Sequence, residues 1–184
     1  MRHLLIGMLT LSLSGCAALT YTEPQTGSRA RVRFVTDTVS PSVLKVYDGD
    51  DCSGAEHEWM RLRVGALLRG SVKRLGMPLW NYHDNAAKEV YVSNDKPLYA
   101  MFWGNEIEGG FHYQCGVPLK IQFQENKDYE VRYRWSRSQC TVIFSEILRN
   151  DAGEHFAQEK EIFNNKTATK DSGCQKQFTR LRFD

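Results

Sequence analysis

Apolar and polar residues alternate with a period of two along much of the chain after residue 29. Ala30, Val32 and Phe34 alternate with arginines, and the same alternation returns at 119–123 and 129–135. Successive side chains of a strand point to opposite faces, so this period predicts strands that bury one face. We expect further strands at 43–47, 60–68, 89–92, 98–103, 141–148 and 178–183. Residues 58–70 fit strand alternation better than helical spacing, but a helix remains the alternative there.

Residues typical of turns separate these segments. Gly, Pro, Asn and Asp gather at 48–50, 76–87, 93–97, 104–110 and 125–128, which predicts turns or loops. The turn at 125–128 lies between two alternating segments, and this order predicts a hairpin. The polar stretch 157–173 predicts a loop or a short helix. Eight or nine short strands with little helix predict an all-β fold, an antiparallel β-sandwich of immunoglobulin-like or transthyretin-like form. A small β-barrel is the alternative.

The first fifteen residues have the pattern of an export signal. A short basic start is followed by an apolar run at 4–13, and this run is shorter than the roughly 20 residues that a membrane-spanning helix needs. The motif Leu13-Ser14-Gly15-Cys16 resembles the bacterial lipobox. That resemblance implies cleavage before Cys16, lipid on its thiol and anchoring to the membrane, which several acyl chains make firm. A plain secretory signal is the alternative.

The residue after Cys16 bears on the location. Ala17 stands where an Asp would indicate retention at the inner membrane, so the same resemblance implies the outer membrane with the domain facing the periplasm. Exposure at the cell surface is the alternative. We expect a signal peptide at 1–15, a lipidated N-terminus and flexible tether at 16–28, and a single β-rich domain at 29–184. A flexible tether of about a dozen residues spans about 20 Å.

The charge of the chain is close to balanced. It has 24 basic and 22 acidic residues, and they are interspersed. This balance argues against a nucleic-acid partner and against a polybasic membrane patch.

Four cysteines remain once Cys16 is assigned to lipid. An even number in an exported chain predicts two disulfides. Closure between neighbours favours Cys52–Cys115 with Cys140–Cys174, and the main alternative pairs Cys115 with Cys140, because these two flank the predicted hairpin. No C-x-x-C motif is present, which disfavours a thiolate metal site.

Motifs for catalysis and for metal binding are not found in the sequence. The acidic run at 48–51 fails the EF-hand spacing, since Trp59 stands at the twelfth position. We expect no cofactor and no metal, because the histidines after the signal have no zinc-site spacing; they are His57, His83, His112 and His155. Glu106 and Glu108 beside Trp103 are the one carboxylate pair that could serve a hydrolase, together with a histidine.

Aromatic residues supply the remaining signal. Most stand at alternating strand positions, where core packing explains them. Tyr99, Trp103 and Tyr133 form a candidate docking patch if they are exposed. The segment 98–103 is apolar on both faces, which indicates a central strand or a docking face.

The chain resembles the small lipoproteins common in proteobacteria in its lipobox, its short tether, its strand at 30–34 and its four cysteines. Those proteins have no assigned activity, so this resemblance implies none. Length and predicted fold are also similar to the outer-membrane lipoprotein of type VI secretion systems, a transthyretin-like sandwich that docks a larger membrane partner. This second likeness concerns the fold alone. Our leading hypothesis is a non-enzymatic binding or assembly module of the cell envelope, with an envelope protein or peptidoglycan as partner. An envelope glycan or peptide hydrolase and an inhibitor of a host enzyme are the alternatives.

Overall fold

Ten strands and no helix make up the part of the chain that the structure describes. The computed structural model describes residues 22–48, 54–63, 74–83, 85–108, 111–136, 139–164 and 179–182, with backbone alone at 107, 108, 111, 112 and 179–182. The strands are β1 (Arg29–Thr36), β2 (Ser42–Tyr47), β3 (Glu56–Leu62), β4 (Ala87–Ser93), β5 (Leu98–Glu108), β6 (Phe111–Ile121), β7 (Asp128–Ser136), β8 (Gln139–Arg149), β9 (His155–Asn164) and β10 (Thr179–Arg182). None of the described residues belongs to a helix that could cross a bilayer.

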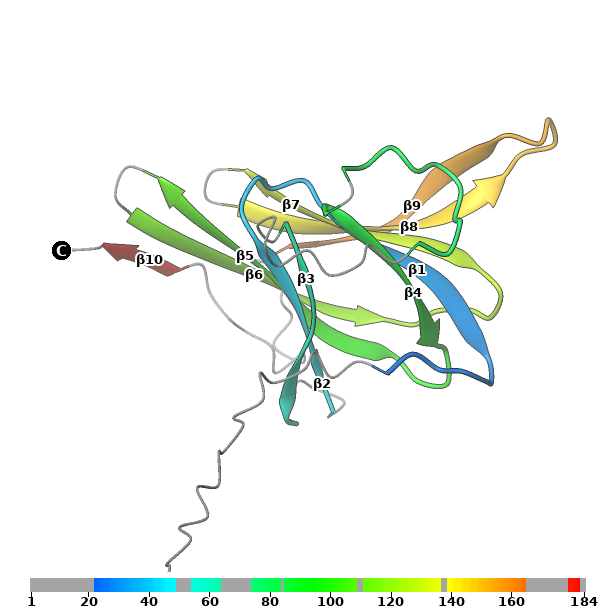
Figure 1. Cartoon of the computed structure of the whole chain (residues 1–184), viewed down its shortest axis with the longest axis horizontal. Helices are drawn as coiled ribbons and strands as arrows, with labels where there is room; N and C mark the ends of the chain where they lie inside the picture. Colours follow the sequence, from blue (N-terminus) through cyan, green and yellow to red (C-terminus); the bar gives the residue numbers. More distant parts are fainter. Residues whose placement is uncertain are drawn as a thin grey trace, which may run out of the picture.

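The strands form two five-stranded sheets that pack face to face (Figure 1). Sheet A has the order β4-β1-β7-β8-β9, and sheet B has the order β10-β6-β5-β2-β3. The alternating apolar residues of β1 face the space between the sheets, where Val32 and Phe34 are fully buried. Phe102 of β5 meets Tyr133 of β7 across this space, with ring centroids 5.0 Å apart. The predicted sandwich is therefore confirmed, and the barrel is excluded.

Strand β1 lies inside sheet A between β4 and β7. It runs antiparallel to β4 but parallel to β7, so the expectation of a wholly antiparallel sandwich is wrong at this one pair. In an immunoglobulin sandwich the first and second strands share a sheet with the fifth and fourth. Here β1 shares its sheet with β4, β7 and β8, while β2 lies in the other sheet. Of the two predicted forms, this strand order leaves the transthyretin-like one.

Three predicted elements differ from the structure. The loop expected at 104–110 is strand as far as Glu108, where β5 ends, and 109–110 lie outside the described residues. The hairpin expected from 119–123 and 129–135 is wrong, since β6 belongs to sheet B and β7 to sheet A, so that the turn between them leads from one sheet to the other. The polar segment from 157 begins as part of β9, which extends beyond the other strands together with β8 (Figure 1).

The ambiguous segment 58–70 is strand at 58–62, and Arg63 is a bend. β3 ends at Leu62, and 64–70 lie outside the described residues. The expected closing strand at 178–183 is confirmed as β10, which pairs with β6 at the edge of sheet B. Residues 22–28 have no regular secondary structure. The signal at 1–15, together with Cys16, Cys52 and Cys174, lies outside the described residues.

A disulfide joins the two sheets. Cys115 of β6 is bonded to Cys140 of β8, with the two Cα atoms 6.0 Å apart, and both residues are fully buried. The favoured pairings, Cys52–Cys115 and Cys140–Cys174, are therefore both wrong, and the alternative is correct. The alternative rested on a hairpin that does not form. Its physical basis is that β6 and β8 face each other across the core.

Candidate functional site

A cavity of about 310 Å³ opens at one end of the sandwich. The end of β2, the end of β4 and the start of β5 meet there, and the segment before β1 runs past them. Its lining residues are Thr22, Pro24, Val46, Tyr47, Asp48, Trp59, Val92, Ser93, Lys96, Pro97, Leu98 and Tyr99. The volume lies at the lower end of the range for small-molecule sites, roughly 300–1,000 Å³.

The segment before β1 is held against this end of the domain by Arg29. Its Nη1 donates to the carbonyl oxygen of Pro24 at 2.8 Å, and its guanidinium lies 4.0 Å from the ring centroid of Tyr91. Arg29 is the first residue of β1, so the strand itself fixes the position of Pro24. The predicted tether thus contributes Thr22 and Pro24 to the cavity wall.

The wall of the cavity is largely apolar. Trp59 is part of the hydrophobic core, and its ring packs edge-on against Phe34 with centroids 5.2 Å apart. The hydroxyl of Tyr47 donates a hydrogen bond to Glu56 at 2.8 Å, and Tyr47 lines the cavity. Burial raises the pKa of the Tyr47 hydroxyl, and the hydrogen bond to Glu56 raises it further, so this phenol stays protonated at neutral pH.

Charged groups of both signs lie at the cavity. Asp48 is paired with the imidazole of His57, whose Nε2 lies 2.7 Å from the Oδ2 of the carboxylate. Lys96 is exposed in the turn between β4 and β5. A cavity with an apolar wall and a cation at its edge suits a ligand that has an apolar body and an anionic end.

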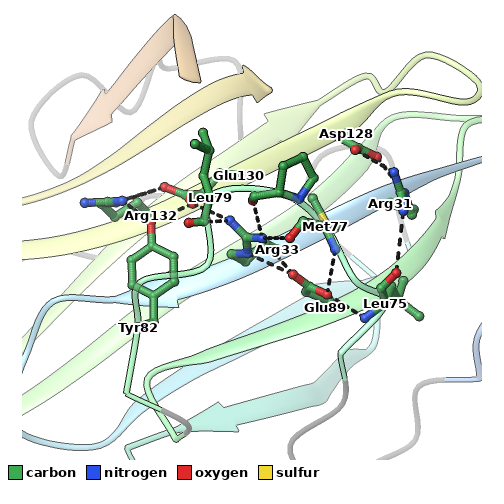
Figure 2. Close-up of polar contacts among 11 residues, drawn as sticks. Arg31, Arg33, Leu75, Met77, Leu79, Tyr82, Glu89, Asp128, Glu130 and Arg132 are labelled. Carbon is green, nitrogen blue, oxygen red and sulfur yellow. Dashed lines mark hydrogen bonds and ion pairs between the residues drawn. The ribbon is translucent and has the colours of Figure 1, made fainter. Parts of the chain in front are cut away.

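A second feature is a buried ion network on the outer face of sheet A (Figure 2). Arg33 of β1 lies between its two cross-strand neighbours, Glu89 of β4 and Glu130 of β7. The shortest distances from its guanidinium are 2.7 Å to Glu89 and 3.3 Å to Glu130. The side chains of Arg33 and Glu89 are fully buried. Arg132 lies on the same strand as Glu130 and bonds to it at 2.8 Å, so two cations balance two carboxylates.

The residues 74–83, which we call the strap, cover this network (Figure 2). Arg33 donates to three consecutive carbonyl oxygens of the strap, those of Met77, Pro78 and Leu79, at 3.0, 2.7 and 3.4 Å. Glu89 in turn accepts hydrogen bonds from the backbone N–H groups of Leu75 and Met77. The strap is thereby fixed to the sheet through its backbone.

The network has no carboxylate oxygen left for chemistry. One oxygen of Glu89 faces Arg33 and the other faces the strap. Glu130 accepts from Arg33, from Arg132 and from the hydroxyl of Tyr82 at 2.7 Å. Burial raises the pKa of Tyr82, and its bond to Glu130 adds to the rise. We interpret the network as a structural device that fixes the strap.

The three residues of the candidate docking patch do not share one surface. Tyr99 lines the cavity, and Trp103 is half-buried on the same strand. Tyr133 is fully buried, stacks on Phe102 and donates its hydroxyl to the carbonyl oxygen of Cys115 at 2.8 Å. A docking role for Tyr133 is therefore wrong, because its strand position points into the core.

The described backbone does not place a histidine opposite either carboxylate of the hydrolase alternative. The backbone register pairs Glu106 with Tyr113 and Glu108 with Phe111, whereas His112 is paired with Ile107. His57, His83 and His155 lie in β3, in the strap and in β9. Within the described ranges, no group of three His, Cys, Asp or Glu side chains is placed to hold a metal ion.

Sequence reasoning missed both features of the site. The arginines of β1 were expected on a solvated face, but Arg33 is fully buried because the strap covers it. Burial of Arg33 could have been predicted only from its pairing with acidic residues on both neighbouring strands. The sequence does not show that pairing, because it does not give the order of strands in the sheet. The cavity residues come from five separate segments and share no motif.

Comparison with known proteins gives no further assignment. No family model matches the chain, and no curated protein or solved structure matches it. The function therefore has to be argued from the sequence motif and the geometry above.

Proposed function

We propose that the protein is a lipid-anchored lipoprotein of the outer membrane that acts as a non-enzymatic binding module of the cell envelope. Two features support the proposal. Leu13-Ser14-Gly15-Cys16 supplies the lipobox-like motif for the anchor. The cavity supplies a binding site, and its position carries the argument, because Thr22 and Pro24 form part of its wall. Thr22 stands only six positions after Cys16, so the site lies within about 20 Å of the anchor.

The anchor is tested by metabolic labelling with a palmitate analogue. The native chain is expected to take up the label and to sediment with membranes. The Cys16→Ala chain is expected to take up none. Equal labelling of the two chains would contradict lipid attachment at this cysteine.

The binding role is tested by photo-crosslinking in intact cells. A photoreactive phenylalanine at Tyr99, in the cavity wall, is expected to give a discrete adduct that disappears with Cys16→Ala. The matched control position is Ile162 on β9, which is 50% exposed and does not line the cavity. The same set of adducts from both positions would show non-specific contact and would count against a binding site at this end of the domain.

A further inference from the structure

We propose that the cavity at the end of the sandwich binds one acyl chain of an anionic phospholipid, and that Lys96 holds the phosphate of its headgroup. The inference deepens the proposed function and rests on it for the nearness of the membrane. It names the ligand class of the cavity as lipid, where the proposed function leaves the ligand open.

The volume and lining of the cavity fit an alkyl chain. Eight of its twelve lining residues have aliphatic, proline or aromatic side chains, and one of these, Trp59, is almost fully buried at 3% exposure. The hydroxyl of Tyr47 is bound by Glu56 and adds no free donor to the wall. At about 310 Å³ the cavity has room for one alkyl segment but not for a folded peptide.

The charges at the cavity favour an anionic headgroup. Lys96 is exposed in the turn, and no ion pair of Lys96 occurs among the described residues. The one acidic side chain of the lining, Asp48, lies 2.7 Å from His57. A lysine beside an anionic lipid surface contributes about 1 kcal/mol, or about fivefold in binding.

The position of the cavity gives the lipid a short route. Thr22 lines the cavity, and the chain between Cys16 and Thr22 reaches at most about 20 Å when fully extended. An anchor at Cys16 would therefore keep the cavity within a lipid length or so of the bilayer surface. This short distance to the bilayer favours a lipid as ligand and does not favour a protein partner.

The experiment uses the full protein in vesicles of phosphatidylcholine that contain a small fraction of phosphatidylglycerol with a diazirine in its acyl chain. After irradiation, peptide mapping is expected to find the label on cavity residues, chiefly Val46, Trp59 and Leu98. The same diazirine acyl chain on phosphatidylcholine is expected to label these residues about fivefold less. Label spread evenly over the exposed surface, or equal labelling by the two lipids, would overturn the inference.

Three variants sharpen the result. Lys96→Gln is expected to lower labelling of the cavity by phosphatidylglycerol about fivefold. Lys120→Gln is the matched control, because Lys120 is also exposed and lies over the ring of Tyr99 without lining the cavity. Val46→Trp fills the cavity from its wall and is expected to abolish labelling there, with an unchanged thermal midpoint as the check on folding. Equal effects of the two lysine variants would remove the assigned role of Lys96.

The outcomes separate this inference from the proposed function. A chain that carries lipid on Cys16 and yet shows no cavity label refutes the acyl-chain site and leaves the anchor intact. A chain that carries no lipid on Cys16, but is labelled in the cavity when mixed with the same vesicles, refutes the anchor and retains the site.

Discussion

Gly104 of β5 lies at a close contact between the two sheets. A Cβ atom at this position would lie 2.6 Å from the hydroxyl oxygen of Tyr133 and 2.8 Å from Cε3 of Trp135. Both aromatic side chains come from β7 in sheet A. The absence of a side chain at Gly104 therefore lets Tyr133 reach the carbonyl oxygen of Cys115. A glycine that suggested a loop in the sequence is a packing residue inside a strand.

Gly104→Ala is expected to lower the free energy of unfolding by about 1–3 kcal/mol, because the new methyl group overpacks the core. Urea unfolding monitored by tryptophan fluorescence measures the loss. Gly116→Ala serves as comparison, since a Cβ atom there would lie no closer than 3.0 Å to its neighbours, the Sδ atom of Met101 and the ring of Trp103, and so would clash less than at Gly104. A loss at Gly104 no greater than at Gly116 would contradict this account.

Glu146 of β8 has a pKa below its ordinary value. Burial alone would raise this pKa, but hydrogen bonds and positive charge from Lys127 and Lys160 outweigh the burial. Each lysine lies 3.0 Å from the carboxylate. A carboxyl whose pKa is lowered by folding stabilises the fold above the pKa of the unfolded chain. This contribution is lost as the pH falls through the lowered pKa of the folded state.

Replacing both Lys127 and Lys160 with Met is expected to raise the pKa of Glu146, since the remaining effect of burial acts upward. Carbon-detected NMR titration of the glutamate carboxyls follows the group directly. The stability advantage of the native chain over this variant should shrink as the pH falls through the lowered pKa of Glu146 in the folded native chain. A pKa of Glu146 that does not change would contradict the role of the two lysines.

At the scale of elements, the strap depends on Arg33. Its guanidinium is shared between Glu89, Glu130 and three strap carbonyl groups, while Leu79 keeps a left-handed backbone with φ of 61°. Such a conformation is costly for leucine and persists where surrounding contacts hold it. The buried arginine is therefore one of the contacts that keep the strap in one conformation, together with Glu89 and the bond between Tyr82 and Glu130.

Arg33→Met is expected to lower the free energy of unfolding by about 3–5 kcal/mol, because it leaves Glu89 buried without its counter-ion. Hydrogen exchange at the amides of Leu75 and Met77 should accelerate at the same time. Adding Glu89→Gln is expected to recover part of the stability. If Glu89→Gln lowered the free energy of unfolding as much in the Arg33→Met variant as in the native chain, the coupling between the two side chains would be disproved.

Elements could be predicted where one face meets the core. The alternation at 30–34 and 129–135 corresponds to β1 and β7, whose inner residues are buried. Strand β9 escaped this reasoning because nearly all its residues are exposed, so its two faces differ little in polarity. The turn residues at 125–128 are equally compatible with a hairpin and with a connection that leads from one sheet to the other. Their partner strands are chosen by distant residues, as are the residues of the cavity and of the ion network.

At the scale of the whole molecule, the Cys115–Cys140 disulfide connects β6 in sheet B with β8 in sheet A. The bond closes a loop with a sequence separation of 25 residues. The turn between β6 and β7 lies within this loop, so the disulfide fixes the point where the chain passes from one sheet to the other.

Replacing Cys115 and Cys140 together with Ala is expected to lower the free energy of unfolding by about 3–4 kcal/mol in the chain-entropy account. The double variant avoids a free thiol that could pair with Cys52 or Cys174. Urea unfolding measures the loss, and peptide mapping without reduction identifies the bonded pair. A peptide that links Cys52 to Cys115 in the native protein would contradict the structure.

The parallel pairing of β1 with β7 also sets the order in which the domain can form. Arg31 and its ion-pair partner Asp128 are 97 positions apart, so β1 is synthesised about a hundred residues before the strand that completes its side of sheet A. During that interval one edge of β1 has no native neighbour, and an open edge invites pairing with other chains. Contacts of such long range also slow folding, typically to milliseconds or seconds in β-sandwiches. The unfinished chain must therefore stay soluble with one edge of this inner strand unpaired until almost three quarters of the protein is present.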